Sequence, residues 1–362
     1  MRLSLRQVCF LLTGLIASLA STSCSVKPQL FGKTELDQTF LKYRDVNASE
    51  WYAYREGELH PNARELTLEH DPSRGIGLKE ANSMGGGEAS IIPTTPLRVF
   101  LLMGQSNMVG HGRSSKLTEP YNQAHPRIRI WSRGKWQYMV PKRNFGPEVT
   151  FAHEMANHFP NDTIGIIKVA VGGTGMNAWK PDWEWSEASK TGDALKGSLY
   201  RDMINAVSEA YRISNFEISG FIWKQGGRDG KKIELAESYQ ERFIEFVNHM
   251  RNDLGVPELP VFVLTYFNEA GLEEHRKILD KVRPNAYPLY LSKARVADYL
   301  DNAFPVYHGR LPTVIDQVHF NTEGQLMLGK MTAQAVSQYY RTFEARLPDS
   351  PSGKIVDPPI PK

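Results

Sequence analysis

This 362-residue sequence has few cysteines, and neither charge sign is in large excess. Its two cysteines are Cys9 and Cys24, and 43 Lys and Arg stand against 40 Asp and Glu, a net charge of +3. This balance gives no reason to expect nucleic acid or an anionic membrane surface as the main partner. After residue 20, no apolar run approaches the roughly 20 residues that a membrane-spanning helix needs. The remaining composition, 41% hydrophobic and 23% charged, is typical of a globular protein with one sizeable core.

The first 23 residues have the pattern of a signal peptide. Arg2 and Arg6 precede an apolar run over residues 8–20, and small residues follow that run. We therefore expect a bacterial protein that is exported, with a mature chain that is periplasmic, secreted or held at the cell surface as a lipoprotein.

Cys24 stands directly after the small residues, where bacterial lipoproteins carry a lipidated cysteine, although Ser21 replaces the usual leucine three positions earlier. Because Cys9 lies inside the signal, cleavage leaves one cysteine and no intramolecular disulfide. Two alternatives stay open: a lipid anchor at Cys24, or cleavage after Ala20 or Ser23 that leaves a free thiol. The sequence does not indicate an oligomeric state.

The rest of the chain divides into three parts: an N-terminal extension and linker (24–95), a main domain (96–345) and a proline-rich tail (346–362). In the main domain, short apolar runs alternate with segments of helical length, which is typical of a β/α chain. The expected strands are 98–103, 127–131, 163–169, 218–223 and 260–266, and the expected helices are 149–159, 195–213, 233–254 and 322–343. The predicted fold class is therefore α/β, a three-layer α/β/α sandwich with a central parallel sheet of about five strands.

Ser106 follows the first expected strand, after Gly104 and Gln105. Ligands of open parallel sheets bind outside the carboxyl ends of the strands, so Ser106 is placed where a nucleophile is useful. A hydroxyl is a poor nucleophile until a base removes its proton. The sequence must therefore supply a base elsewhere.

Asp316 and His319, shortly before the last expected helix, are candidates for the base and its partner. Their spacing can bring both side chains to one side of a turn, so that the carboxylate holds the imidazole while its other nitrogen faces Ser106. The Asp-x-x-His spacing alone is a weak signal, since an N-cap aspartate followed by a packed histidine has the same pattern.

Two further strand ends carry glycine-rich segments, Gly172-Gly173 after the third strand and Gln225-Gly226 after the fourth. Glycine lets the backbone approach a ligand closely, and a buried glutamine amide is a preorganised donor. We expect these segments and Ser106 to converge on one crevice.

Together these motifs resemble those of the SGNH (GDSL-like) hydrolases, in the branch that includes sialate O-acetylesterases and acetylxylan esterases. They occur in the family's order, as 104–108, 171–174, 223–226 and 316–320. The resemblance implies a flavodoxin-like fold and a serine esterase that removes O-acetyl groups from carbohydrate without metal or other cofactor. The implied substrate is an acetylated polysaccharide such as xylan, or O-acetyl sialic acid.

The resemblance also implies roles for individual residues. Ser106 would be the nucleophile, His319 the base and Asp316 its partner, and the reaction would pass through an acetyl-enzyme. The backbone amides of Ser106 and Gly173 and the side chain of Gln225 would form the oxyanion hole.

One position departs from the family pattern Trp-x-Gln-Gly-Glu-x-Asp, because Gly227 stands in place of the glutamate while Asp229 is kept. This departure keeps two alternatives in view: a carbohydrate-binding protein with a degraded esterase site, and a general SGNH lipase or thioesterase. Trp179 follows the second motif, and we predict that it binds substrate by stacking on a sugar ring. Burial of a long loop by this ring is the alternative.

Two other kinds of site are disfavoured by context. Residues 173–178 fit a dinucleotide fingerprint, but they follow a third strand and residues 179–183 break the helix that would hold the pyrophosphate. His153-Glu154 begins a zinc-helix pattern that has Asn157 in place of the second histidine. A substrate contact by His111, close in sequence to Ser106, stays open.

Overall fold

The computed structural model describes residues 95–344. The expected signal peptide, Cys24, nearly all of the N-terminal extension and the proline-rich tail lie outside these residues. Within them, no helix is both long enough and apolar enough to cross a membrane.

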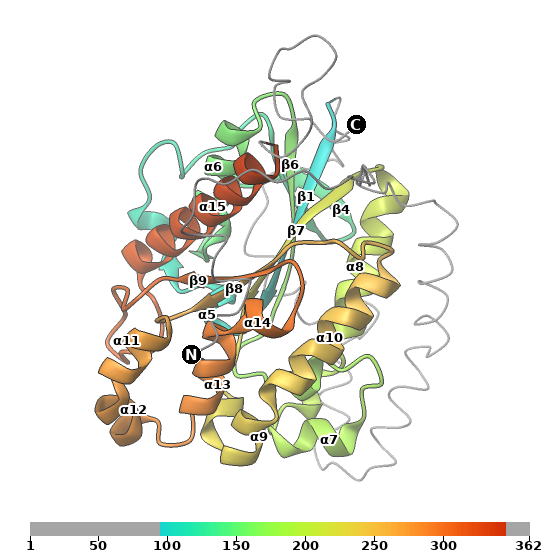
Figure 1. The fold of residues 1–362 in the computed structure, drawn as a ribbon. Helices are drawn as coiled ribbons and strands as arrows, with labels where there is room; N and C mark the ends of the chain where they lie inside the picture. Colours follow the sequence, from blue (N-terminus) through green and yellow to red (C-terminus); the bar gives the residue numbers. More distant parts are fainter. Residues whose placement is uncertain (1–94, 345–362) are drawn as a thin grey trace, which may run out of the picture.

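A seven-stranded sheet with the order β4-β3-β6-β1-β7-β8-β9 forms the centre of the domain (Figure 1). Its strands are β1 (Leu97–Gly104), β3 (Ile128–Ser132), β4 (Lys135–Tyr138), β6 (Thr163–Ala170), β7 (Glu217–Lys224), β8 (Val261–Thr265) and β9 (Ala303–Tyr307). All neighbouring pairs are parallel except β3 and β4. The predicted parallel core is confirmed, and the expected number of about five strands is corrected to seven.

Both additional strands lie at the edges of the sheet. β4 returns antiparallel to β3 through a turn at Arg133 and Gly134, which both have positive φ. β9 contains Pro305, which an edge strand tolerates because one side of it needs no ladder hydrogen bonds. β4 lacks the continuous apolar run by which a buried parallel strand is recognised, and Pro305 interrupts the short apolar run of β9.

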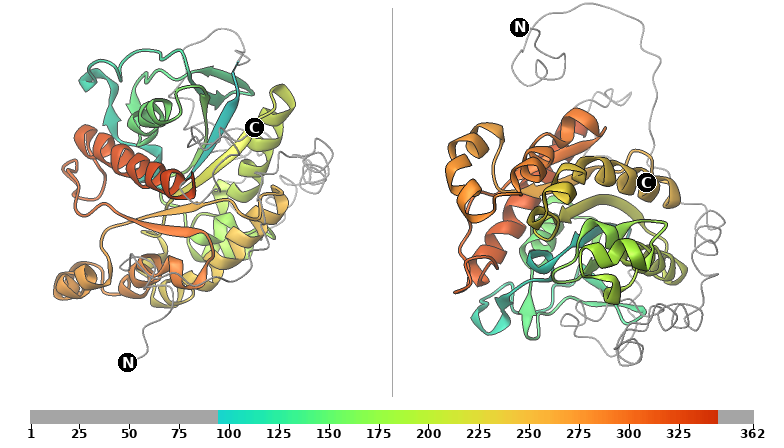
Figure 2. Two further views of the ribbon diagram at one scale, coloured as in Figure 1. Left: turned by 45° about the horizontal axis from the view of Figure 1, so that its top comes forward. Right: turned by 90° about the horizontal axis from the view of Figure 1, so that it is seen from below.

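Helices cover both faces of the sheet and make three layers (Figures 1 and 2). One face carries α6 (Glu148–His158) and α15 (Thr322–Glu344), and the other carries α8 (Leu199–Ile213) and α10 (Tyr239–Asp253). Each face has its own cluster of buried apolar side chains. Since a fully buried Leu, Ile or Phe side chain contributes roughly 1.5–3 kcal/mol, these two clusters are the main source of stability.

Two expected helices differ from those observed. The segment 233–254 is split at Ser238 into α9 (Ile233–Glu237) and α10, and the Ser238 hydroxyl donates to the carbonyl of Glu234. The segment 195–213 becomes helical at Leu199, where the Ser198 side chain caps the backbone N–H of Arg201.

Short elements complete the described chain. The helices are α5 (Ser106–Val109), α7 (Trp185–Lys190), α11 (Glu269–Glu274), α12 (Arg276–Val282), α13 (Tyr287–Ala294) and α14 (Val296–Tyr299). A second, two-stranded sheet pairs β2 (Gly112–Arg113) with β5 (Asn144–Phe145) beside α5.

Candidate active site

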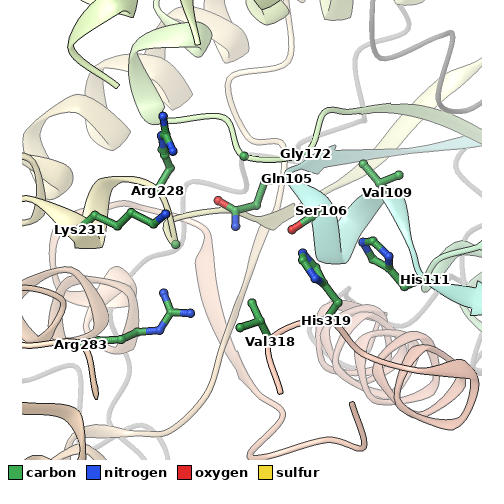
Figure 3. Close-up of a pocket in the computed structure, with 12 residues that line it drawn as sticks. Gln105, Ser106, Val109, His111, Gly172, Arg228, Lys231, Arg283, Val318 and His319 are labelled. Atoms are coloured by element: carbon green, nitrogen blue, oxygen red, sulfur yellow. The ribbon is translucent and has the colours of Figure 1, made fainter. Parts of the chain in front are cut away.

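The carboxyl ends of β1, β6 and β7 lie level, because Gly104 is in register with Ala170 on one side and Lys224 on the other. The segments that leave these strand ends, together with the loop before α15, surround a cavity of about 520 Å³ (Figure 3). It is lined by Gln105, Ser106, Val109, His111, Gly172, Gly173, Gly227, Arg228, Lys231, Arg283, Val318 and His319.

Ser106 is presented to this cavity by a sharp turn. A Cβ on Gly104, whose φ is 152°, would lie 2.2 Å from the carbonyl oxygen of Lys224, so glycine is required there. Neither the N–H nor the hydroxyl of Ser106 hydrogen-bonds to a described residue. The turn therefore leaves both groups available to a substrate.

A buried lysine supports the far end of α5. The ammonium of Lys168, from β6, donates to the carbonyl of Val109 at 2.8 Å and to the carboxylate of Glu148 at 2.7 Å. The same carboxylate accepts the N–H of Gly146 at 2.8 Å. Because each of these buried polar groups is paired, α5 is held in one position against β6.

His319 lines the cavity beside Ser106 (Figure 3). Asp316 holds its ring in place. Its Nδ1 lies 2.5 Å from a carboxylate oxygen of Asp316, so Nδ1 carries the donated hydrogen and Nε2 is left as an acceptor. The other carboxylate oxygen accepts the N–H groups of His319 and Val318 at 2.9 and 2.8 Å. These hydrogen bonds, the backbone ones first, hold the pKa of Asp316 well below its usual range and keep it ionised.

The turn between Asp316 and His319 matches the spacing argument from the sequence. Gln317 adopts φ 56° in the middle of this turn, and its N–H donates to the carbonyl of Val314. The N–H of Val314 in turn donates to the carbonyl of His319 at 2.8 Å. The structure thus brings Ser106 and His319 into one cavity, with Asp316 hydrogen-bonded to His319 from outside the cavity lining.

Asn107 is a site residue to which the sequence reasoning assigned no role. Its buried amide donates to the carbonyl of Val318 at 3.0 Å and accepts the N–H of Phe320 at 2.9 Å. These two bonds join the serine turn to the loop that carries His319. Its place directly after Ser106 was the signal that could have drawn attention to it.

The ring of His111 packs against the ring of His319, with centroids 4.2 Å apart and an interplanar angle of 34°. Burial first, and then the neighbouring His319, lower the pKa of His111 below its ordinary value. At neutral pH His111 is therefore an uncharged ring that lines the cavity and covers one face of His319.

The second glycine motif forms the part of the cavity wall next to Ser106. Gly172 and Gly173 line the cavity, and a Cβ on Gly172 would lie 3.8 Å from the Cβ of Ser106. The carbonyl of Gly172 accepts a hydrogen bond from the Lys196 ammonium, whereas the N–H of Gly173 has no partner in the described chain. The free N–H groups of Ser106 and Gly173 are the donor type that an oxyanion needs.

The structure does not bring Gln225 to the cavity, which corrects its expected place in the oxyanion hole. Its side chain is 3% exposed, and its amide nitrogen donates to the carbonyl of Thr174 at 3.0 Å and to Asp229 at 2.7 Å. An amide nitrogen has two hydrogens, so none is left for a substrate. Asp229, itself fully buried, also accepts from the N–H of Met176 and from Arg242. Gln225 and Asp229 thus join the second and third motifs behind the cavity wall.

Trp179 does not face the cavity either, and its predicted stacking on a sugar is wrong. Its ring is fully buried and packs edge-on against Trp223 at 4.9 Å and Phe246 at 5.8 Å. An indole without an exposed face has no surface to offer a sugar. The alternative weighed from the sequence, burial of the loop, is the one observed.

The cavity wall away from Ser106 and His319 carries the cations Arg228, Lys231 and Arg283 (Figure 3). The Nε of Arg228 is anchored by donating to the carbonyl of Thr191. No carboxylate belongs to the residues that line the cavity in the described chain. This half of the cavity therefore presents positive charge. Residues 95–344 also contain no group of three His, Cys, Asp or Glu side chains that could hold a metal ion.

Fold and site together define an α/β/α hydrolase domain with a serine, a histidine and an aspartate at the carboxyl edge of its sheet. The chain belongs to the family of carbohydrate esterases described as sialic acid-specific acetylesterases, whose model matches residues 96–338. The resemblance seen in the sequence is thereby confirmed at the level of the family.

Individual relatives agree with this assignment. The chain is 27% identical over 268 residues to the probable carbohydrate esterase At4g34215 of Arabidopsis thaliana, covering 67% of this chain and 91% of that protein. The X-ray structure of that protein matches with a TM-score of 0.54 at 24% identity, covering 67% and 98% of the two chains. The crystal structure of NanS matches with a TM-score of 0.52 at 16% identity, covering 70% and 100%. The two structures establish the shared fold.

Proposed function

We propose that the protein is a serine esterase that removes O-acetyl groups from carbohydrate through an acetyl-enzyme intermediate. The observation that carries this proposal is that His319, which is hydrogen-bonded to Asp316, lines the same cavity as Ser106. An ionised carboxylate on Nδ1 leaves Nε2 free to accept the serine proton.

The reaction proceeds in two halves. In the first, Ser106 Oγ attacks the acetyl carbonyl carbon while His319 takes its proton, and the N–H groups of Ser106 and Gly173 stabilise the oxyanion. The tetrahedral intermediate then expels the sugar oxygen, which receives the proton from His319. In the second half, water loses a proton to His319 and attacks the acetyl carbon on Ser106. The bond between this carbon and Ser106 Oγ then breaks, Oγ takes the proton back from His319, and acetate is released.

Arg228, Lys231 and Arg283 favour one of the two substrates implied by the sequence. Xylan backbones are neutral, whereas sialic acid has a carboxylate, and guanidinium and ammonium groups bind carboxylates through charge-assisted hydrogen bonds. We therefore propose an acetylated sugar that carries a carboxylate as the preferred substrate.

The decisive experiment is hydrolysis of p-nitrophenyl acetate by the wild type and by Ser106→Ala. Turnover that Ser106→Ala abolishes supports the esterase, and an absence of Ser106-dependent turnover leaves the carbohydrate-binding protein as the remaining reading. Equal rates on acetyl, butyryl and octanoyl esters would instead favour a general lipase or thioesterase. Acetate release from O-acetyl sialic acid and from acetylated xylan then compares the two substrates.

The place of this reaction in the cell is a separate proposal. The signal-peptide pattern supports export, and Cys24 supports a lipid anchor as the single attachment to a membrane. The mass of the mature N-terminus distinguishes a lipidated Cys24 from a free thiol.

A further inference from the structure

Gln105 places a side-chain amide in the cavity immediately before Ser106. Its backbone is held on both sides, because its N–H donates to the carbonyl of Lys224 at 3.0 Å and its carbonyl accepts from Met108 and Val109. Its side-chain oxygen accepts the N–H of Gly226 at 3.3 Å, which turns the Nε2 amide away from Gly226. That nitrogen has no acceptor among the described residues.

Gly227 provides the space that this amide occupies. A Cβ at position 227 would lie 2.9 Å from Nε2 of Gln105, closer than real Cβ contacts come. The φ of Gly227 is not in the left-handed region, so its backbone does not require glycine. What glycine supplies here is room. Any side chain at 227, including the glutamate usual in the sequence pattern, would displace the Gln105 amide.

With Gln225 bonded elsewhere, the oxyanion hole lacks the side-chain donor expected from the sequence, and the Gln105 amide can take that place. Both hydrogens of the Gln225 amide are used behind the wall, whereas those of the Gln105 amide bond to no acceptor within residues 95–344. Figure 3 shows the Gln105 amide beside Ser106, on the side away from His111. Hydrogen bonding to Gly226 and a fixed backbone preorganise this donor before substrate arrives.

We propose that the Gln105 side-chain amide donates to the acyl oxygen as negative charge develops on it, and that Gly227 is the residue that admits this amide to the site. Gln105 is then a catalytic residue that completes an oxyanion hole with the N–H groups of Ser106 and Gly173. The inference rests on the serine-esterase function proposed above. Under this inference Gly227 contributes to an active oxyanion hole and does not indicate a degraded esterase site.

The first test compares Gln105→Ala and Gln105→Glu with the wild type on p-nitrophenyl acetate. Loss of one oxyanion donor typically lowers kcat by about 10²- to 10³-fold, and we expect both variants to fall in this range with little change in KM. Glutamate keeps the shape of the side chain but replaces the amide hydrogens by negative charge, so a loss in this variant shows that the shape of the side chain alone does not support catalysis. Gln137→Ala, which removes a buried amide that bonds to the carbonyl of Ser132, serves as the control for folding and should keep its activity.

The second test uses Gly227→Ala and the double variant with Gln105→Ala. Because the added methyl acts by displacing the Gln105 amide, we expect Gly227→Ala to lower kcat and the double variant to be no worse than Gln105→Ala. Melting temperatures of all variants separate loss of function from loss of fold.

Three results would overturn the inference: kcat within about 3-fold of wild type for Gln105→Ala, a rise in KM alone, or multiplying effects in the double variant. A rise in KM alone would make Gln105 a contact to the sugar rather than to the acyl oxygen. If Ser106→Ala also retains turnover, the esterase proposal itself has failed, whereas Ser106-dependent turnover that ignores Gln105 overturns this inference alone.

Discussion

Asn107 holds His319 in place from both sides, because its amide donates to the residue before the histidine and accepts from the residue after it. The nucleophile turn and the base loop are more than 200 positions apart in the sequence and are joined by this one side chain. The position of His319 relative to Ser106 therefore depends on Asn107, which follows Ser106 in the sequence and bonds to both residues that flank His319.

Asn107→Ala should lower both kcat and stability. A misplacement of about 1 Å at a catalytic group can cost roughly 10²-fold, while loss of these buried hydrogen bonds costs about 1–3 kcal/mol. Steady-state kinetics and urea unfolding measure the two effects. A variant with wild-type kcat and reduced stability would show that Asn107 serves the fold and leaves the catalytic geometry unaffected.

His111 should act as an uncharged ring on His319. His111→Phe keeps an aromatic face, and we expect it to retain most of the activity, because the lowered pKa of His111 already keeps the native ring neutral. His111→Lys puts a cation near the imidazolium that forms on His319, and we expect kcat/KM to fall by about 10-fold or more. Values of kcat/KM for the wild type and both variants, measured at neutral and mildly alkaline pH, test whether His111→Lys loses more activity than His111→Phe. Equal loss in both variants would point to a polar contact by His111 instead.

Arg228, Lys231 and Arg283 should strengthen the binding of negatively charged substrates and leave that of neutral ones unchanged. Arg283→Gln and Lys231→Gln should each raise KM for an acetylated sugar acid by about 10-fold, since each removes a charge-assisted contact worth about 1.5 kcal/mol or more. The methyl ester of the same sugar acid has no anionic charge and should be unaffected. Lys232→Gln is the matched control, because Lys232 bonds to the carbonyl of Lys190 and does not line the cavity. Equal KM for the acid and its ester in the wild type would contradict the proposed preference.

Lys293 should make stability depend on pH. Its fully buried ammonium donates to the carbonyls of Gln225 and Leu264 at 2.8 Å, and burial lowers its pKa from 10.5 to about 7. Between these two values the unfolded chain binds one proton more than the folded chain, so the free energy of unfolding rises with pH by about 1.4 kcal/mol per unit. At lower pH both states are protonated and this slope disappears.

Urea unfolding at about pH 8 and about pH 9 tests this slope in the wild type and in Lys293→Met. The variant should lack the contribution of Lys293, so the wild type should gain about 1.4 kcal/mol more than the variant over this interval. The same gain in both proteins would mean that Lys293 stays charged when folded.

The sequence by itself determined the layered fold and the local parts of the site. Buried parallel strands have continuous apolar runs, which is why β1, β6 and β7 were predicted where they occur. Ser106 follows such a strand directly, and Asp316 and His319 lie three positions apart, so a single turn suffices to join them. These features depend on neighbours in the chain, which a sequence displays.

The tertiary structure decided which polar and aromatic groups reach the cavity. The sequence pointed to Gln225 as the side-chain donor and not to Gln105, but Asp229 and the carbonyl of Thr174 take both amide hydrogens of Gln225. Trp179 is likewise unavailable to a substrate, because it packs in the core against Trp223 and Phe246. Hydrogen-bond partners and burial are set by residues distant in sequence, and so the free donor at the site follows from packing.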